Sequence, residues 1–451
     1  MTEATETAST KSMRHRALWS SYLGSAIEYY DFLLYGIAAA LIFPHVFFAL
    51  DPAVATLASL GTLAAGYVAR PLGAIFFGHY GDKIGRKKML MLTLYLMGVA
   101  SFLMGVLPSY AQIGIAAPLS LIALRIVQGF AVGGEWAGAT LLSMEHAGKR
   151  SRGFAASIVG SGAPTGAVLA TLALMPFAAM SEDAFLNWGW RVPFLLSAFL
   201  VGIAVYLRRS VDETPDFVAL QESSTRETKP KIPLFVVFSS YPREVLNGVL
   251  GALACLAMTT LTATFMVNYA ISVGGHERSE VLGLLTLVNV LHIFTIPTFA
   301  ILSDHIGRKP VMLAGAVAGM ALIFPIFSLI TAGDPLSLLI AFALCNPLIH
   351  GLMGGPISAW LGEKFAADIR YSGMAVTFQI GSTVSAGFAP LIATWLLTQG
   401  GGEDATLVGV FYIALCAISA VAILFSTESF RKKLDLTTTP RLPSGEKQTS
   451  R

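Results

Sequence analysis

The chain has 451 residues, of which 55% are hydrophobic and only 13% are charged. Soluble globular proteins carry about 25% charged residues, so the composition excludes that class and indicates a protein that crosses a membrane many times. The net charge of +3 gives no indication of a nucleic-acid partner.

The apolar segments predict twelve spanning helices, because a helix needs about 20 mostly apolar residues to cross a bilayer. In chain order they lie near 17–49, 54–79, 89–108, 114–144, 154–180, 189–208, 244–272, 280–302, 311–331, 335–361, 372–398 and 405–427. We therefore expect an all-α membrane protein with two pseudo-symmetric six-helix bundles, residues 17–208 and 244–427. A hydrophilic loop, residues 209–243, joins them.

The positions of lysine and arginine orient these segments, since cytoplasmic loops carry an excess of both residues. With the N-terminus inside, all of them but four fall on the cytoplasmic side. The four exceptions are Arg70 and Arg125 within spans, and Arg191 and Arg278 on the outer side. We expect a multi-pass cell-membrane protein whose tails, 1–16 and 428–451, are cytoplasmic. The polar composition of residues 1–12 predicts a disordered tail.

An internal repeat relates the two predicted bundles. GDKIGRKK at 81–88 recurs as SDHIGRKP at 303–310, and RSRG at 150–153 recurs as RYSG at 370–373. Each match joins corresponding helices of its half. Duplicated halves around a site at the middle of the membrane are a plan of secondary transporters, whereas no enzyme needs such a plan.

Several long strings resemble one transporter family. GHYGDKIGRKK at 78–88 resembles the loop 2–3 signature of the major facilitator superfamily. The resemblance becomes narrower when four more strings are included: AIEYYDFLLYG, ARPLGAIFF, RIVQGFAVGGEWAGA and WGWRVPF. Together these strings resemble the metabolite:H+ symporter family within that superfamily. In the second half the resemblance rests on SDHIGRKP and FAADIRYSG.

The resemblance implies alternating-access import of a small organic acid, of a shikimate-like mono- or dicarboxylate type, by proton symport. The proton gradient drives such a carrier, so no cofactor is expected, and the partners are the substrate, protons and the lipid bilayer around a monomer. Uptake of a zwitterion such as proline or betaine, uniport, and export in exchange for protons stay open.

Five charged residues lie firmly inside the predicted spans, away from their ends, and all are in the first half: Glu28, Asp31, Arg70, Arg125 and Glu135. Such charges are costly in lipid and face a bundle interior or an aqueous cavity. We expect these five residues to take part in proton coupling. The alternative is that they form static pairs, for example Arg70 with Glu135.

Helical spacing places Glu28, Asp31 and Tyr35 on one face of the first segment. It places Arg125, Gln128 and Glu135 on one face of the fourth segment. We expect Asp31 and Arg125 to pair across these two helices, an arrangement that the family resemblance supports. An adjacent arginine favours the ionised acid and removal from water favours the neutral acid. Opening and closing a cavity would therefore change the balance between these two effects, so that Asp31 binds or releases a proton. Protonation of Asp31 would free Arg125 to bind a substrate carboxylate.

Charges in the repeated loops predict a cytoplasmic gate. Arg86 can reach a carboxylate such as Glu145, and Glu363 is a possible partner for Arg308. Such contacts would hold one conformation and release it on switching. The gate candidates are Asp82, Arg86, Lys87 and Glu145 in the first half, and Asp304, Arg308 and Glu363 in the second. The alternative is that these charges only fix the topology.

Polar residues in apolar segments are candidates for substrate binding: Tyr35, Arg125, Gln128, Asn268, Tyr269, Asn346, His350 and Gln379. Each of those in the second half could instead make an ordinary interhelical hydrogen bond. The membrane histidines His292 and His350 lie on different helices with no acidic companion. We therefore expect no metal site and no catalytic group, which excludes an enzyme.

Overall fold

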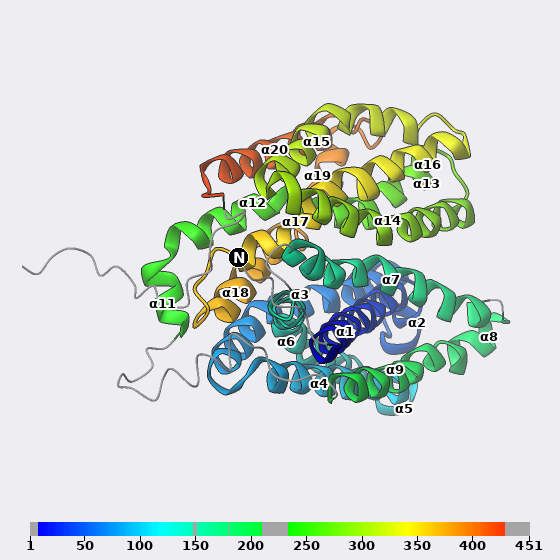
Figure 1. The fold of residues 1–451 in the computed structure, drawn as a ribbon. Coiled ribbons are helices and arrows are strands. Elements are labelled where there is room, and N and C mark those ends of the chain that lie inside the picture. Colours follow the sequence, from blue (N-terminus) through cyan, green and yellow to red (C-terminus); the bar gives the residue numbers. More distant parts are fainter. Residues whose placement is uncertain (1–7, 148–150, 179, 210–232, 429–451) are drawn as a thin grey trace, which may run out of the picture.

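The computed structural model of the chain describes residues 8–147, 151–178, 180–209 and 233–428 (Figure 1). Within these ranges the chain is almost entirely helical and contains no strand. Most of the predicted central loop, and the predicted C-terminal tail beyond Glu428, lie outside the described residues. The first helix begins at Ala8, so residues 8–12, which we expected in a disordered tail, are helical.

The first half consists of six long helices with short helical turns between them. They are α1 (Ala8–Leu41), α2 (Phe43–Phe47), α3 (Pro52–Ile84), α4 (Arg86–Val106), α5 (Tyr110–Ile113), α6 (Ala116–Glu145), α7 (Arg152–Ala178), α8 (Glu182–Ala184), η2 (Phe185–Gly189) and α9 (Arg191–Arg209). Residue Gly85, with a φ of 122°, separates α3 from α4.

The second half repeats this pattern with more interruptions. Its helices are α11 (Pro233–Ser240), α12 (Pro242–Thr260), η3 (Leu261–Met266), α13 (Val267–Ser272), α14 (Arg278–Ile306), α15 (Arg308–Ile330), α16 (Pro335–Ala343), η4 (Leu344–His350), α17 (Gly351–Gly362), α18 (Arg370–Val384), α19 (Ala389–Gln399) and α20 (Thr406–Phe425). The segments η3 and η4 are π-helical turns within long helices, a feature frequent at functional sites. Pro347 lies in η4, where it removes one backbone donor.

Among the described residues, twelve helical stretches are long enough to cross a membrane. Ten stretches of the described residues combine the length and hydropathy of a span. The other two are α1 and α3, of 34 and 33 residues, which exceed the roughly 20 residues needed. These two carry charged residues within their apolar runs. The prediction of an all-α membrane protein with twelve spans is therefore confirmed.

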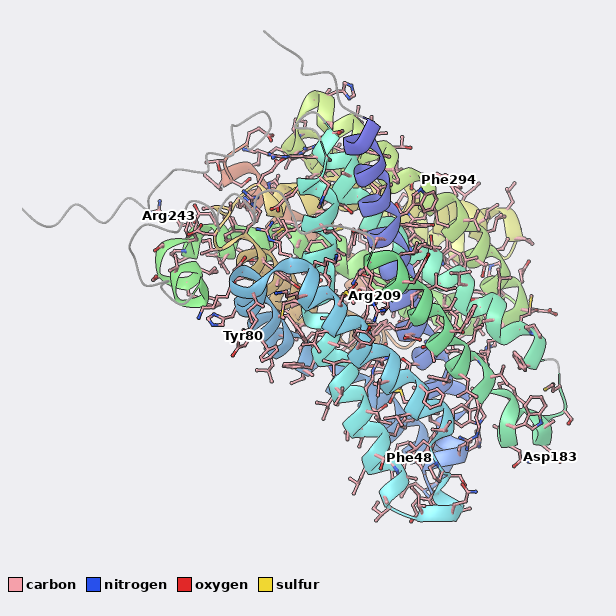
Figure 2. All side chains as sticks on the ribbon, turned by 60° about the horizontal axis from the view of Figure 1, so that its bottom comes forward. Phe48, Tyr80, Asp183, Arg209, Arg243 and Phe294 are labelled. Atoms are coloured by element: carbon pink, nitrogen blue, oxygen red, sulfur yellow. The ribbon has the colours of Figure 1, made fainter. Side chains whose placement is uncertain are left out.

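Labelled residues mark the two ends of the molecule. Figure 2 shows Arg243 near one end and Phe48 and Asp183 near the other. We call the end where Gly85 and Gly307 join consecutive helices the junction end. Between the ends, large apolar side chains point outward; Phe294 is 65% exposed, as expected of a lipid-facing surface.

Helices from the two halves pack against each other in two symmetric places. In Figure 1 the helices α1 to α9 lie mainly in the lower part and α12 to α20 mainly in the upper part. Helix α7 of the first half packs on α14 and α17, and α18 of the second half packs on α3 and α6.

Glycines allow α3 and α6 to approach backbone to backbone. A Cβ atom at Gly73 would lie 1.8 Å from the carbonyl oxygen of Phe130, and one at Gly133 would lie 2.2 Å from that of Arg70. Small residues at such crossings permit close packing of membrane helices. This packing fixes Arg70 on α3 relative to Arg125 on α6.

The substitution Gly73→Ala should overpack this crossing and lower stability by about 1–3 kcal/mol. The melting temperature of the purified protein measures the effect. Gly61→Ala is the matched control, because Gly61 lies on the same helix and a Cβ there meets nothing within 4 Å. Equal melting temperatures for the two variants would contradict the close approach.

Candidate functional site

A cavity lies between the two halves. Residues of α1, α3, α6 and α7 line it from one side, and residues of α12, η3, α14, η4, α17 and α18 from the other. Arg70 is the only lysine or arginine in its wall, and no aspartate or glutamate lines it among the described residues. The cavity therefore offers positive charge without a fixed negative partner.

Asp31 and Arg125 do not pair directly, which corrects the sequence-based expectation. Ser101 on α4 donates to Asp31 Oδ2 at 2.9 Å, and Gln128 Nε2 donates to Ser101 Oγ at 2.9 Å. Arg125 Nη1 donates to Gln128 Oε1. A chain of three hydrogen bonds thus links the acid to the arginine, because two neutral polar side chains lie between them.

Phe32 connects this chain to the cavity. The Arg125 guanidinium lies 4.7 Å from the centroid of the Phe32 ring, and the Arg70 guanidinium lies 4.5 Å from it. Arg125 also lies 4.1 Å from the Tyr35 ring. Phe32 and Arg70 line the cavity, whereas Asp31, Arg125 and the predicted ligands Tyr35 and Gln128 lie behind its wall.

Glu28 and Arg70 have different surroundings. Glu28 Oε2 is buried and has no hydrogen-bond partner. The Arg70 guanidinium lies 4.3 Å from the Tyr67 ring centroid, and its Nε has no hydrogen-bond partner. No ion pair within 4 Å joins the two residues in the described part of the chain. Arg70 is thus available to a ligand that enters the cavity.

The alternative pairing of Arg70 with Glu135 is wrong. Glu135 binds Arg208, whose Nη1 lies 3.2 Å from Oε2 and whose Nη2 contacts Oε1. Thr93 also donates to Glu135. The positive-inside count took Arg208 as one of the cytoplasmic charges, yet Arg208 is only 1% exposed. Its burial could have been predicted from its position in the last turn of an apolar helix.

The structure separates the candidate ligands of the second half. Asn346 and His350 line the cavity. Tyr269 donates its hydroxyl to the carbonyl of Glu403 at 2.9 Å, away from the cavity, and Asn268 precedes it on α13. Gln379 lies between α18 and α6, with Nε2 3.5 Å from the carbonyls of Val132 and Gly133.

The two halves are linked at the junction end by a reciprocal pair of contacts. Asp82, near the end of α3, accepts hydrogen bonds from the backbone N–H of Tyr371 at 3.2 Å and of Ser372 at 2.9 Å. Asp304, near the end of α14, accepts from the N–H of Gly153 at 3.0 Å and of Phe154 at 2.9 Å. Each acid therefore binds the positive start of a helix from the other half.

Arginine–carboxylate pairs surround these contacts. The predicted contacts of Arg86 with Glu145 and of Arg308 with Glu363, the latter at 3.1 Å, are present. Arg370 of the second half also binds Glu145, at 2.8 Å, which bridges the halves. Arg370 opens the repeated string RYSG, a signal that sequence reasoning did not use for the gate. Lys87, predicted in the gate, donates to the carbonyl of Arg209 in its own half.

Lys364 adds a titratable cation beyond the end of α17. Its Nζ lies 4.0 Å from the Trp360 ring centroid. Burial lowers the pKa of the Lys364 ammonium to about 8. This group therefore loses its charge in mildly alkaline solution, in contrast to the arginines at the same end.

Two aromatic rings close the cavity towards the junction end. Trp136 of α6 and Phe378 of α18 line the cavity and stack with centroids 3.6 Å apart and planes at 11°. Beyond them, the Tyr371 hydroxyl donates to the carbonyl of Gly134 at 2.8 Å. The stack and the contacts of Asp82 and Asp304 together hold the two halves shut at this end.

Comparison with known proteins decides the family. The shikimate transporter of Escherichia coli K12 is 38% identical over 422 residues, which cover 93% of this chain and 96% of that protein. The proline/betaine transporter of Salmonella typhimurium LT2 is 33% identical over 427 residues, covering 93% and 84%. Residues 19–232 match the family model "Sugar (and other) transporter", and residues 275–447 match "Major Facilitator Superfamily".

The chain belongs to the major facilitator superfamily. A solved structure of a proton:xylose symporter bound to 6-bromo-6-deoxy-D-glucose has the same fold, with a TM-score of 0.76 and 17% identity over 94% of this chain and 98% of that one. The predicted family resemblance is confirmed, and the protein is a multi-pass membrane transporter rather than an enzyme.

If the Asp82 contacts hold this transporter shut at the junction end, Asp82→Ala should open it. The variant loses hydrogen bonds to a charged acceptor worth about 1.5–3 kcal/mol each, so the junction end should separate more often. Spin labels at Tyr80→Cys and Asp368→Cys, in a chain whose three native cysteines are replaced, measure the distance across this end. It should lengthen in Asp82→Ala.

The control for this measurement is Asp183→Ala, because Asp183 lies at the opposite end of the molecule (Figure 2). It should leave the distance distribution unchanged. An Asp82→Ala distribution identical to that of the control would show that the contacts with Tyr371 and Ser372 do not hold the halves together.

Proposed function

We propose that the transporter imports a small organic acid, shikimate-like or another mono- or dicarboxylate, together with protons by alternating access. The observation that carries this proposal is the charge of the cavity wall. Arg70 lines it, and among the described residues no carboxylate accompanies it. An anionic substrate supplies the missing charge, and the similarity to a shikimate transporter supports this substrate class.

A zwitterion such as proline or betaine is the second candidate, supported by similarity to proline/betaine transporters. Tyr29, Phe32, Tyr67, Trp136 and Phe378 line the cavity, and aromatic faces bind quaternary ammonium groups. Arg70, however, already lies over Phe32 and Tyr67. A positive ligand group at those rings would meet a like charge, so the acid is favoured.

Proton coupling is proposed to act through the chain of hydrogen bonds behind the wall. When Asp31 takes a proton, its hold on the Ser101 hydroxyl weakens, because a neutral acid is a poorer acceptor than a carboxylate. The change passes through Gln128 to Arg125, which lies against Phe32. Since Phe32 also contacts Arg70, the protonation state of Asp31 reaches the substrate site. Glu28 and the Glu135–Arg208 pair are proposed to support this region electrostatically.

The positive-inside count supports assigning the junction end to the cytoplasm, with both termini on that side. In this orientation the closed junction end corresponds to a carrier shut towards the cytoplasm. Asp82, Arg86, Glu145, Asp304, Arg308 and Glu363 then serve as the cytoplasmic gate. We propose a monomer driven by the proton gradient without a cofactor.

Uptake into proteoliposomes tests the substrate and the coupling. Labelled shikimate, α-ketoglutarate, citrate and proline are offered with and without an inward proton gradient. Gradient-driven accumulation of one of the acids is expected. Accumulation of proline alone would replace the acid by a zwitterion, and equilibration without accumulation would indicate a uniporter.

Asp31→Asn should abolish gradient-driven accumulation of the acid while leaving exchange of labelled for unlabelled substrate. The amide cannot bind the proton that couples the gradient to transport, but it keeps the hydrogen bond from Ser101. Parallel accumulation and exchange assays measure both properties. Asp183→Asn is the control, and an Asp31→Asn variant that still accumulates substrate would remove Asp31 from the coupling mechanism.

Arg70→Gln should raise the KM for the acid by about 10- to 100-fold, the loss expected for a hydrogen bond to a charged group. Arg70→Lys should lose less, because it keeps the charge. Initial rates of uptake measure KM, with Arg243→Gln as a control because Arg243 lies at the junction end (Figure 2). An unchanged KM in Arg70→Gln would place the substrate elsewhere.

A further inference from the structure

Two histidines of the second half bind each other at the cavity wall. His292 Nε2 on α14 lies 2.9 Å from His350 Nδ1 in η4, and both residues line the cavity. Thr295 Oγ1 lies 3.3 Å from His292 Nδ1. His350 Nε2 has no hydrogen-bond partner among the described residues. The pair thus has one nitrogen joined to the protein and one left for the cavity.

The geometry limits this pair to one extra proton. The short contact between the rings needs one N–H and one acceptor nitrogen, so both rings cannot carry a proton there. In the neutral pair, His350 Nε2 is a donor or an acceptor according to the tautomer. After one proton is added, both outer nitrogens carry hydrogen, and His350 Nε2 becomes a positively charged donor.

No charged group of the described protein balances that positive charge. On α7, α12, α15, α16 and α17, which pack around the pair, no described carboxylate, lysine or arginine lines the cavity. The other titratable side chains in the cavity wall are Tyr29, Tyr67, Arg70 and Cys255. An imidazolium here would therefore lack a counter-ion until an anion enters the cavity.

Asn346 gives a second, independent indication of a ligand. It lies four residues before His350 in η4 and lines the cavity. Asn346 is 4% exposed, and its Oδ1 atom has no hydrogen-bond partner. A buried acceptor without a donor is costly, and a hydroxyl group of a bound molecule would satisfy it.

We propose that the His292–His350 pair takes up one proton when it binds the carboxylate of the transported acid, and that Asn346 accepts a hydrogen bond from a hydroxyl of the same molecule. The proton comes from water and adds to the free imidazole nitrogen, with no covalent bond broken. The inference rests on the proposed function and assigns to the second half a proton site separate from Asp31.

A role in metal binding does not fit this pair. The described residues contain no group of three histidine, cysteine or acidic side chains that could hold a metal ion. A purely structural role would account for the contact between the rings, but not for the free nitrogen of His350 or the unsatisfied oxygen of Asn346.

Calorimetric titration of the full chain in detergent tests the proposal. Shikimate, α-ketoglutarate and citrate are each titrated at neutral pH in two buffers of different ionisation enthalpy, which counts the protons taken up on binding. The wild type should take up roughly one proton per bound acid. His350→Gln and His292→Gln should lose this uptake and bind about 10- to 100-fold more weakly.

Three further variants test whether the proton is taken up by this pair rather than by another titratable group. His305→Gln is the matched control, since His305 is an exposed histidine on the same helix as His292, and it should behave as wild type. In an Asp31→Asn background, which lacks the other proposed proton site, His350→Gln should still abolish the proton uptake on binding. Asn346→Ala should weaken binding of shikimate and citrate, which carry hydroxyl groups, more than binding of α-ketoglutarate.

The outcomes distinguish the two proposals. If the wild type binds none of the three acids, the proposed function fails and this inference fails with it. If the wild type binds an acid and a folded histidine variant takes up the same proton, only the inference is overturned. If neither histidine variant folds, equal weakening of binding for all three acids in Asn346→Ala would overturn it, and a selective loss for the hydroxylated acids would support it.

Discussion

Charged side chains within a membrane are expensive unless another protein group or water holds them. The first half of this chain buries six of them: Glu28, Asp31, Arg70, Arg125, Glu135 and Arg208. Glu135 and Arg208 hold each other, whereas Asp31 and Arg125 are joined through Ser101 and Gln128. Arg70 rests on aromatic rings beside the cavity. Only the last arrangement leaves a charged group available to a ligand, so the other contacts also define where a substrate can bind.

The second half lines its side of the cavity with polar side chains that carry no permanent charge. Histidines and amides line its side of the cavity, so no permanent counter-charge is needed when the cavity is empty. The first half offers a fixed cation and the second half a conditional one. This difference between two halves of one repeat gives the cavity two distinct walls, although the helices that form them correspond in order.

Sequence reasoning recovered the architecture because its signals are strong over long distances. Twenty-residue apolar segments, the positive-inside asymmetry and the repeat at 81–88 and 303–310 predicted twelve spans in two bundles. The Arg86–Glu145 and Arg308–Glu363 contacts followed from opposite charges at corresponding loops.

Contacts between particular side chains were harder to predict. Ser101 and Gln128 are ordinary polar residues whose place between Asp31 and Arg125 depends on how α1, α4 and α6 pack. Arg208 is buried although it lies in the last turn of α9, next to the predicted loop. The contact of His292 with His350 depends on the relative rotation of α14 and η4, and no periodicity within either helix specifies it.

The contacts of Asp82 and Asp304 have the form of an isologous interface. In a symmetric dimer, a residue of one subunit contacts a second residue of its partner, and the same contact occurs in reverse. Here an acid at the end of α3 binds the start of α18, and an acid at the end of α14 binds the start of α7. The chain thus resembles a two-fold dimer whose subunits have been fused. Covalent linkage fixes the local concentration of the two halves, so this interface can remain weak enough to break in every transport cycle without the halves dissociating.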